Sequence, residues 1–224
     1  MNRSKAIVAS YAGVLFFSAF IFLGAGKFLY WQGLLYLCVA LLGTTLNHLL
    51  VRKDSDITSE RASRAREGKA WDRRMLGAIS LVSIVTFVTA GLDSGRFGWS
   101  GQVSGLVTVA GVMLMLCGQV LFAMAKREND FFSSTVRIQS ERGHRVCETG
   151  PYRFVRHPGY LGMLMALVAF PLVLGSKWAF IPTSVGALLL VVRILLEERF
   201  LVEHLAGYAE YATRTRWRLV PWVF

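Results

Sequence analysis

Charged residues are scarce in this chain: only 17% of its 224 residues are Asp, Glu, Lys or Arg, whereas 54% are hydrophobic. Soluble globular domains carry about 25% charged residues, so the composition argues against a soluble domain. Cysteine is scarce as well, and Cys38, Cys117 and Cys147 form no CxxC or Cys/His pattern. Neither a zinc site nor a disulfide framework is therefore supported. Cys38 and Cys117 fall in apolar runs, where we expect them to be packing residues.

Acidic residues are the rarer charge, with 14 Asp and Glu against 25 Lys and Arg, which gives a net charge of +11. A basic balance of this size can indicate a nucleic-acid partner. Here the apolar runs are too long for that class of protein, and the basic residues cluster at the ends of the runs. The charge therefore indicates orientation in a membrane, and no nucleic-acid partner is expected.

Long apolar runs are what the chain has in abundance. They predict spans over residues 6–26, 31–51, 75–92 and 104–125, a shorter helix over 158–174 and a sixth over 177–198. The first run follows two basic residues, as a signal peptide does, but it is longer than usual and lacks a clear cleavage site, so we interpret it as a retained span. The mixed-charge segment 52–74 is interpreted as an interfacial helix. The fold class expected is an all-α, multi-pass integral membrane protein with about six transmembrane or membrane-embedded helices.

The basic residues alternate between the two sides of this layout. The N-terminus, the loops 52–74 and 126–157 and the C-terminal tail carry nearly all of them, and the other side carries only Lys27, Arg96 and Lys177. Because cytoplasmic loops are enriched in Lys and Arg, both termini are predicted to be cytoplasmic. The helix over 158–174 has about 17 residues, fewer than the roughly 20 that a full crossing needs.

A polar and aromatic stretch, residues 150–162, opens the fifth apolar run. Pro158 suits the first turn of a helix, and the residue before a proline avoids the α region, so His157 is predicted to lie in the loop. The free N–H groups of that helix start, with Arg156 and His157 beside them, form a seat for an anion. The alternative is a plain cytoplasmic loop whose arginines only anchor the next helix.

Ionisable residues near the end of the sixth run form a second candidate. Arg193 and Glu197 are four residues apart and share a helix face, while Glu198 points about 100° away from Glu197. The alternative is an intrahelical Arg193–Glu197 ion pair that reaches the membrane surface. Other polar groups in the spans, namely Asn47, His48 and Gln119, are expected to make interhelix hydrogen bonds. We expect close helix packing at Gly105, Gly111 and Gly118.

Two separated motifs carry a family resemblance. The first is Arg156-His157-Pro158-Gly159-Tyr160-Leu161-Gly162, and the second is Glu197-Glu198, followed by Gly207-x-x-x-Tyr211 and Val220-Pro221. On these residues the chain resembles the isoprenylcysteine carboxyl methyltransferase family, with its phospholipid methyltransferase relatives, over about residues 126–224. The resemblance implies methyl transfer from S-adenosylmethionine, held in a pocket open to the cytosol, to a lipophilic acceptor that enters from the bilayer. The chain is then a single membrane domain, 1–224, with a four-helix part (1–125) and a cofactor-binding and catalytic part (126–224).

The resemblance also places the site residues by position. Cofactor contacts are expected at Gln139, His144, Arg145, Val146, Cys147, Tyr152, His157, Pro158, Gly159, Tyr160 and Glu197. Arg193 matches the family's arginine for the acceptor carboxylate, and Arg193 and Glu197 are the expected catalytic residues. No metal site is expected.

The acceptor decides how much chemistry the protein must supply. A carboxylate, such as a prenylcysteine-type C-terminus, needs no general base because the sulfonium is already a good methyl donor; an amine or hydroxyl would need one, from Glu198 or His157. Two other classes stay open. In an NADPH-dependent sterol-type membrane reductase, Arg137, Arg142 and Arg145 could hold the 2′-phosphate. A transporter or scaffold is the non-enzymatic alternative, but a transporter should show polar groups near mid-membrane or paired broken helices.

Overall fold

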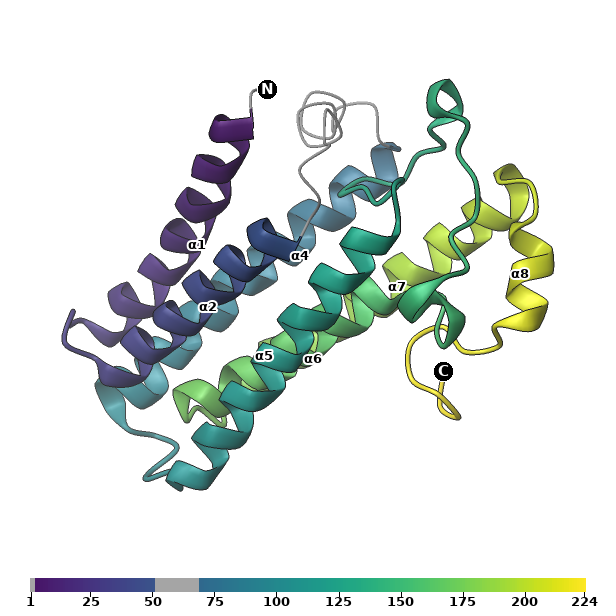
Figure 1. The fold of residues 1–224 in the computed structure, drawn as a ribbon. Helices are drawn as coiled ribbons and strands as arrows, with labels where there is room; N and C mark the ends of the chain where they lie inside the picture. The colour runs from purple at the N-terminus through teal and green to yellow at the C-terminus, as the bar shows by residue number, and fades with distance from the viewer. Residues whose placement is uncertain (1–2, 51–68) are drawn as a thin grey trace.

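The computed structural model describes residues 3–50 and 69–224, and every element in these ranges is helical. In order they are α1 (Arg3–Ala25), α2 (Trp31–Leu50), α4 (Ala70–Ala90), η2 (Gly91–Phe97), α5 (Gly105–Glu128), η3 (Ser140–Arg142), η4 (Gly150–Arg153), α6 (Pro158–Leu174), α7 (Phe180–His204) and α8 (Tyr208–Arg214). The long helices lie roughly along one direction, and the loop 129–157 and α8 gather at one end of them (Figure 1). The predicted all-α class is confirmed.

Within residues 3–50 and 69–224, five segments are long and apolar enough to cross a membrane: α1, α2, α5, α7 and the continuous segment formed by α4 and η2. The sixth apolar helix, α6, has 17 residues and matches its predicted bounds. The chain is therefore a multi-pass membrane protein. Most of the predicted interfacial helix over 52–74 lies outside the described residues, and its last residues belong to α4.

Two predicted spans are longer in the structure. The third begins at Ala70, and at Gly91 it passes into the wider turns of η2, which run to Phe97. The predicted loop over 93–103 is therefore partly helical. The sixth span runs to His204, beyond the predicted residue 198. The apolar pattern stops at Glu197, but Arg199 and Glu203 form an ion pair one turn apart, which supports further helix where the chain leaves the apolar layer.

The antiparallel helices α5 and α6 touch backbone to backbone. A Cβ atom on Gly118 would lie 2.6 Å from the carbonyl oxygen of Gly162, and one on Gly111 would lie 2.7 Å from the Cβ of Leu172. The prediction of close packing is confirmed for Gly111 and Gly118. It is wrong for Gly105, which has no atom within 4 Å of such a Cβ because it lies at the exposed start of α5.

Polar side chains within the spans join neighbouring helices. Lys126 donates to the Asn47 side chain over 3.2 Å, and Gln119 donates to the carbonyl of Val39 over 3.4 Å, as predicted for Asn47 and Gln119. The His48 ring packs 5.9 Å from the ring of Tyr11. The packing prediction for Cys38 and Cys117 is wrong: both are exposed, on helix faces that point away from the bundle.

At the end of the bundle away from the 129–157 loop, the buried carboxylate of Asp93 ties two connections together. It accepts hydrogen bonds from the backbone N–H of Ser100 at 2.7 Å, the Ser176 hydroxyl at 2.6 Å and the backbone N–H of Trp178 at 3.3 Å. The Ser100 hydroxyl also donates to it. These bonds close the far end by joining the α4–α5 connection to the α6–α7 connection.

Candidate functional site

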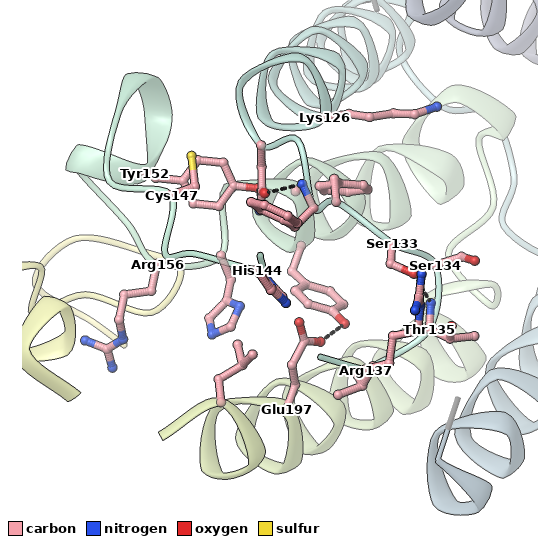
Figure 2. Close-up of a pocket in the computed structure, with 18 of the residues that line it drawn as sticks. Lys126, Ser133, Ser134, Thr135, Arg137, His144, Cys147, Tyr152, Arg156 and Glu197 are labelled. Atoms are coloured by element: carbon pink, nitrogen blue, oxygen red, sulfur yellow. Dashed lines mark hydrogen bonds between the residues drawn. The ribbon is translucent and has the colours of Figure 1, made fainter. Parts of the chain in front are cut away.

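A cavity of about 600 Å³ opens at the other end of the bundle, beneath the loop 129–157. One part of its wall is apolar and comes from the membrane helices: Ala6 and Ala9 of α1, Leu76 of α4, Phe122 of α5 and Met163 of α6. The other part is polar and comes from the loop, the start of α6 and α7. Figure 2 shows His144 and Tyr152 from the loop and Glu197 from α7 reaching into this space. The cavity can therefore hold a polar ligand beside a lipophilic one.

The start of α6 forms one polar wall. Pro158 occupies the first helical turn and His157 lies just outside the helix, as predicted, and no side chain among the described residues caps this start. The N–H of Leu161 bonds to the carbonyl of His157, so the N–H groups of Gly159 and Tyr160 precede the first helical bond. Gly159 lines the cavity. An uncapped helix start of this kind attracts an anion.

His157 is buried at this wall as a neutral imidazole. Burial lowers its pKa to about 4; the carboxylate of Glu198 opposes that shift, and the guanidinium groups of Arg156 and Arg218 add to it. Its Nε2 atom is buried and has no hydrogen-bond partner in the described part of the chain. A buried polar atom without a partner is costly, which marks this position as one that a ligand atom could satisfy.

Glu197, on α7, forms a second polar part of the wall. Its carboxylate lines the cavity and accepts a hydrogen bond from the hydroxyl of Tyr160, which comes from α6 (Figure 2). A carboxylate has about four acceptor positions, so one bond leaves capacity for a ligand ammonium or hydroxyl.

Arg193 lies deeper in the cavity wall, and its partners were not expected. Its Nε donates to Asp72 of α4 over 2.8 Å, and its Nη2 donates to the carbonyl of Ser134 over 2.8 Å. The alternative of an intrahelical Arg193–Glu197 pair is therefore wrong, because each residue is bonded to another element. Asp72 was missed from the sequence; its only local signal is an acid placed before Arg73 and Arg74 at the start of an apolar run.

The loop 131–147 folds against itself around Gln139. The Gln139 side chain donates to the carbonyl of Phe131 over 2.7 Å and accepts from Arg142 over 2.8 Å. It does not line the cavity, so its predicted cofactor contact is not supported by its position. Its backbone N–H donates to Nδ1 of His144, whose ring stacks on Phe131 at 4.5 Å. Burial, together with the cations Arg137 and Arg142, lowers the pKa of His144 to about 4.

Tyr152 joins the loop to α5 and α8. Its hydroxyl accepts a hydrogen bond from Asn129 and donates to the carbonyl of Ala125, both over 3.4 Å, and its own carbonyl accepts from the Tyr211 hydroxyl at 2.7 Å. Burial raises its pKa well above the ordinary value for tyrosine. Burial also raises the pKa of the nearby Cys147 thiol, so this cysteine stays protonated.

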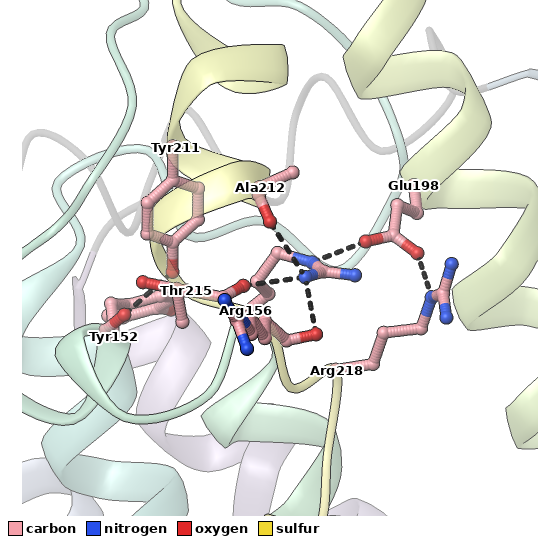
Figure 3. A network of polar contacts seen from close by, with 8 residues as sticks. Tyr152, Arg156, Glu198, Tyr211, Ala212, Thr215 and Arg218 are labelled. Atoms are coloured by element: carbon pink, nitrogen blue, oxygen red, sulfur yellow. Dashed lines mark hydrogen bonds and ion pairs between the residues drawn. The ribbon is translucent and has the colours of Figure 1, made fainter.

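The C-terminal tail is clamped to the residues before α6. The backbone N–H groups of Arg156 and His157 donate to the carbonyls of Trp217 and Arg218, both over 2.9 Å. Arg156 and Arg218 both donate to Glu198, and Arg156 also reaches the carbonyl of Thr215 over 2.6 Å (Figure 3). Glu198 is buried and does not line the cavity, so its position does not support the suggested role as a base. The Arg156 guanidinium likewise bonds to Glu198 and to the tail, and Arg156 also lines the cavity.

The structure therefore gathers all of the predicted site residues around one cavity except Gln139 and Pro158. It adds residues that the sequence did not single out for it: Asn129, Phe131, Phe132, Ser134, Thr135, Tyr208 and the N-terminal Ala6 and Ala9. None carries a local motif. Of the arginines suggested for a 2′-phosphate, Arg137 is paired with Glu141 and Arg142 with Gln139.

Comparisons with known proteins fall on the same half of the chain. Residues 109–203 match the model of the isoprenylcysteine carboxyl methyltransferase family. The protein-S-isoprenylcysteine O-methyltransferase of Saccharomyces cerevisiae is 32% identical over 117 residues, which cover 49% of this chain and 47% of that protein. A probable protein-S-isoprenylcysteine O-methyltransferase of Oryza sativa subsp. indica is 32% identical over 116 residues, 48% of this chain and 58% of that protein. The chain spans about half the length of the curated relatives it matches. The predicted resemblance is confirmed over this region.

Proposed function

We propose that this chain, whose second half is similar to the isoprenylcysteine carboxyl methyltransferase family, is a membrane methyltransferase that transfers a methyl group from S-adenosylmethionine to the carboxylate of a lipophilic acceptor. The observation that carries the proposal is the presence of two polar groups of opposite character in one cavity. The uncapped helix start with the unpartnered Nε2 of His157 suits an anionic group, and the carboxylate of Glu197 suits a cationic one.

These groups fit the amino-acid end of S-adenosylmethionine. Its carboxylate suits the N–H groups of Gly159 and Tyr160 beside His157, and its ammonium suits Glu197. The rings of Tyr152 and Tyr160 line the same cavity and suit the sulfonium or the adenine. Bound there, the cofactor supplies an activated methyl group.

The chain's own contribution is alignment and exclusion of water. A carboxylate acceptor carries its own nucleophilic electron pair, so no side chain has to remove a proton. Two bonds of the Arg193 guanidinium go to Asp72 and Ser134, which leaves further N–H donors for an acceptor carboxylate. Holding the two reactants in line and removing water from their charges are the main sources of rate.

The acceptor class follows from the apolar wall. A lipid-like chain can lie against Ala6, Leu76 and Met163 while its carboxylate reaches Arg193. The relatives' printed names point to isoprenylcysteine, and we propose a prenylcysteine-type C-terminus or a similar lipidated acceptor. The start of α1 and the loop 129–157 line the same cavity, so they share one side of the membrane. We propose that this side is cytoplasmic and that the membrane-embedded acceptor approaches from the bilayer.

The test is equilibrium binding of S-adenosylmethionine to the purified full chain in detergent. We expect Glu197→Ala to weaken binding about 10- to 100-fold, since a hydrogen bond to a charged group contributes about 1.5–3 kcal/mol. Glu203→Ala, an exposed glutamate on the same helix, is the matched control and should bind as the wild type does. Tight binding of NADPH in place of S-adenosylmethionine, or equal loss in both variants, would overturn the proposal.

A further inference from the structure

Asp72 is fully buried in the first turn of α4 and joins three parts of the molecule. One carboxylate oxygen accepts the Nε–H of Arg193 on α7 over 2.8 Å, and the other accepts the backbone N–H of Val136 in the loop over 2.9 Å. Asp72 does not line the cavity. It therefore acts on the site only through the two groups that it holds.

The two groups it holds belong to different walls of the cavity. Arg193 is 4% exposed, and its guanidinium lies 5.4 Å from the centre of the Tyr160 ring. A second bond, to the carbonyl of Ser134, ties the same guanidinium to the loop. The hydrogen bonds thus form a ring that links Asp72 to Arg193, Arg193 to residues 134–136 of the loop, and these residues back to Asp72. Moving the loop breaks bonds of both Asp72 and Arg193.

We propose that Asp72 is a positioning residue that orients Arg193 toward the acceptor carboxylate and couples this orientation to residues 134–136 of the loop. The inference rests on the proposed function and extends it to a residue outside the region 109–203 that matches the family model. The fork of a guanidinium binds a carboxylate well in one plane only, so its orientation decides its affinity for the acceptor.

Charge and orientation act in opposite directions when Asp72 is neutralised. Removing its negative charge makes the cavity more positive, and this alone would strengthen carboxylate binding. Removing its acceptor atom frees Arg193 to turn and leaves either Arg193 or Val136 facing an amide NH₂ group. Our proposal requires the loss of orientation to outweigh the gain in positive charge. A misaligned guanidinium loses the paired hydrogen bonds by which it distinguishes a carboxylate from an ester.

The experiment measures how strongly the site prefers an acid over its ester. The probes are N-acetyl-S-farnesylcysteine and its methyl ester, bound to the full chain with saturating S-adenosylhomocysteine, so that no turnover occurs. Affinities are normalised to the number of S-adenosylhomocysteine sites, which removes any unfolded fraction. The variants are Asp72→Asn, Asp72→Glu, Arg193→Gln, the double variant Asp72→Asn/Arg193→Gln and the buried control Asp93→Asn.

We expect the wild type to bind the acid about tenfold or more tightly than the ester. This ratio corresponds to one hydrogen bond between charged groups. Arg193→Gln should abolish the preference, and both Asp72 variants should lower it by about fivefold or more. In the double variant the loss of Asp72 should add nothing, because there is no guanidinium left to aim. Asp93→Asn should lower the melting temperature and leave the preference intact, which separates positioning from general destabilisation.

Three results would overturn the inference: an unchanged or stronger preference in the Asp72 variants, an additive loss in the double variant, or a preference that survives Arg193→Gln. All three leave S-adenosylhomocysteine binding in place, and so leave the methyl-donor assignment standing. Failure of the wild type to bind S-adenosylhomocysteine is a different result, and it would remove the proposed function itself.

Discussion

Asp72 and Asp93 lie near opposite ends of one continuous helical segment, α4 and η2, and neither has exposed surface. In the described part of the chain, the donors to Asp93 are all neutral, two serine hydroxyls and two backbone N–H groups, and these bonds close the far end of the bundle. Asp72 accepts from a guanidinium beside an open cavity. Both ends of the segment therefore hold a buried carboxylate. They differ in the partner of that carboxylate, because the guanidinium of Arg193 has further N–H donors that can bind a ligand.

The largest expected loss of stability comes from substitution of Asp93, at the end of the bundle away from the cavity. Asp93→Ala leaves four donors without their acceptor, at about 1–3 kcal/mol each where water cannot reach. We expect the free energy of unfolding to fall by about 4 kcal/mol. Thermal unfolding in detergent checks this, with the exposed Asp130→Ala as control. A large loss of cofactor affinity per folded molecule would contradict the division between the two ends.

Glu198→Gln should follow, with a loss of about 3 kcal/mol, because it breaks a buried ion pair with Arg156 and weakens the bond to Arg218. Unlike Asp93, Glu198 holds the tail whose carbonyls bind the backbone of Arg156 and His157. The variant should therefore also weaken S-adenosylmethionine binding. Calorimetric titration of the folded fraction measures this, and an affinity equal to that of the wild type would show that the tail does not shape the pocket.

The pH dependence of the free energy of unfolding should report on His157, at the cavity end of the bundle. The pKa of His157 is lowered to about 4 in the folded protein, against about 6.5 when unfolded. The unfolded chain then binds more protons between these values, so stability is full above pH 6.5 and falls as the pH drops toward 4. His157 alone should contribute a loss of about 2 kcal/mol at pH 5.

Melting temperatures of the wild type and His157→Gln between pH 4.5 and 8 report this effect. The variant should show a shallower decline, because one of the groups that gains a proton on unfolding is gone. A decline of the same slope in both proteins would mean that His157 is not held neutral.

The smallest effect should come from the surface of α7. Arg199 and Glu203 form an ion pair at 3.2 Å with side chains 80% and 53% exposed. Exposed pairs contribute little, so Glu203→Gln should change the free energy of unfolding by less than about 0.5 kcal/mol. A change above 1 kcal/mol in thermal unfolding would show that this turn packs against something more than solvent.

Features with a local cause could be predicted from the sequence. Apolar runs gave the helices, and Pro158 fixed both the start of α6 and the loop position of His157, because its ring acts on its immediate neighbours. Spacing placed Arg193 and Glu197 on one face, and both line the cavity.

Features that depend on distant partners could not be predicted. Arg193 bonds to Asp72, which is 121 positions away, and no periodicity encodes that choice. Gln139 turns from the cavity because Phe131 and Arg142 satisfy it, and Cys38 and Cys117 point outward because helix rotation is set by packing. An apolar pattern also cannot tell the two faces of a span apart when lipid is as apolar as the core.

The short α6 has a consequence for how the reaction should be measured. Its 17 residues rise about 26 Å, less than the roughly 30 Å of a bilayer core, whereas the 24 residues of the adjacent α5 rise about 36 Å. Gly159 at the start of α6 lies beside Ala125, so the cavity there lies below the end of α5 at Glu128. Under the proposed function, a membrane-anchored acceptor reaches this site by diffusing in the two dimensions of the bilayer. The rate of methyl transfer should follow the mole fraction of acceptor among the lipids. Adding inert lipid at constant volume should therefore lower this rate, although the concentrations in the water are unchanged.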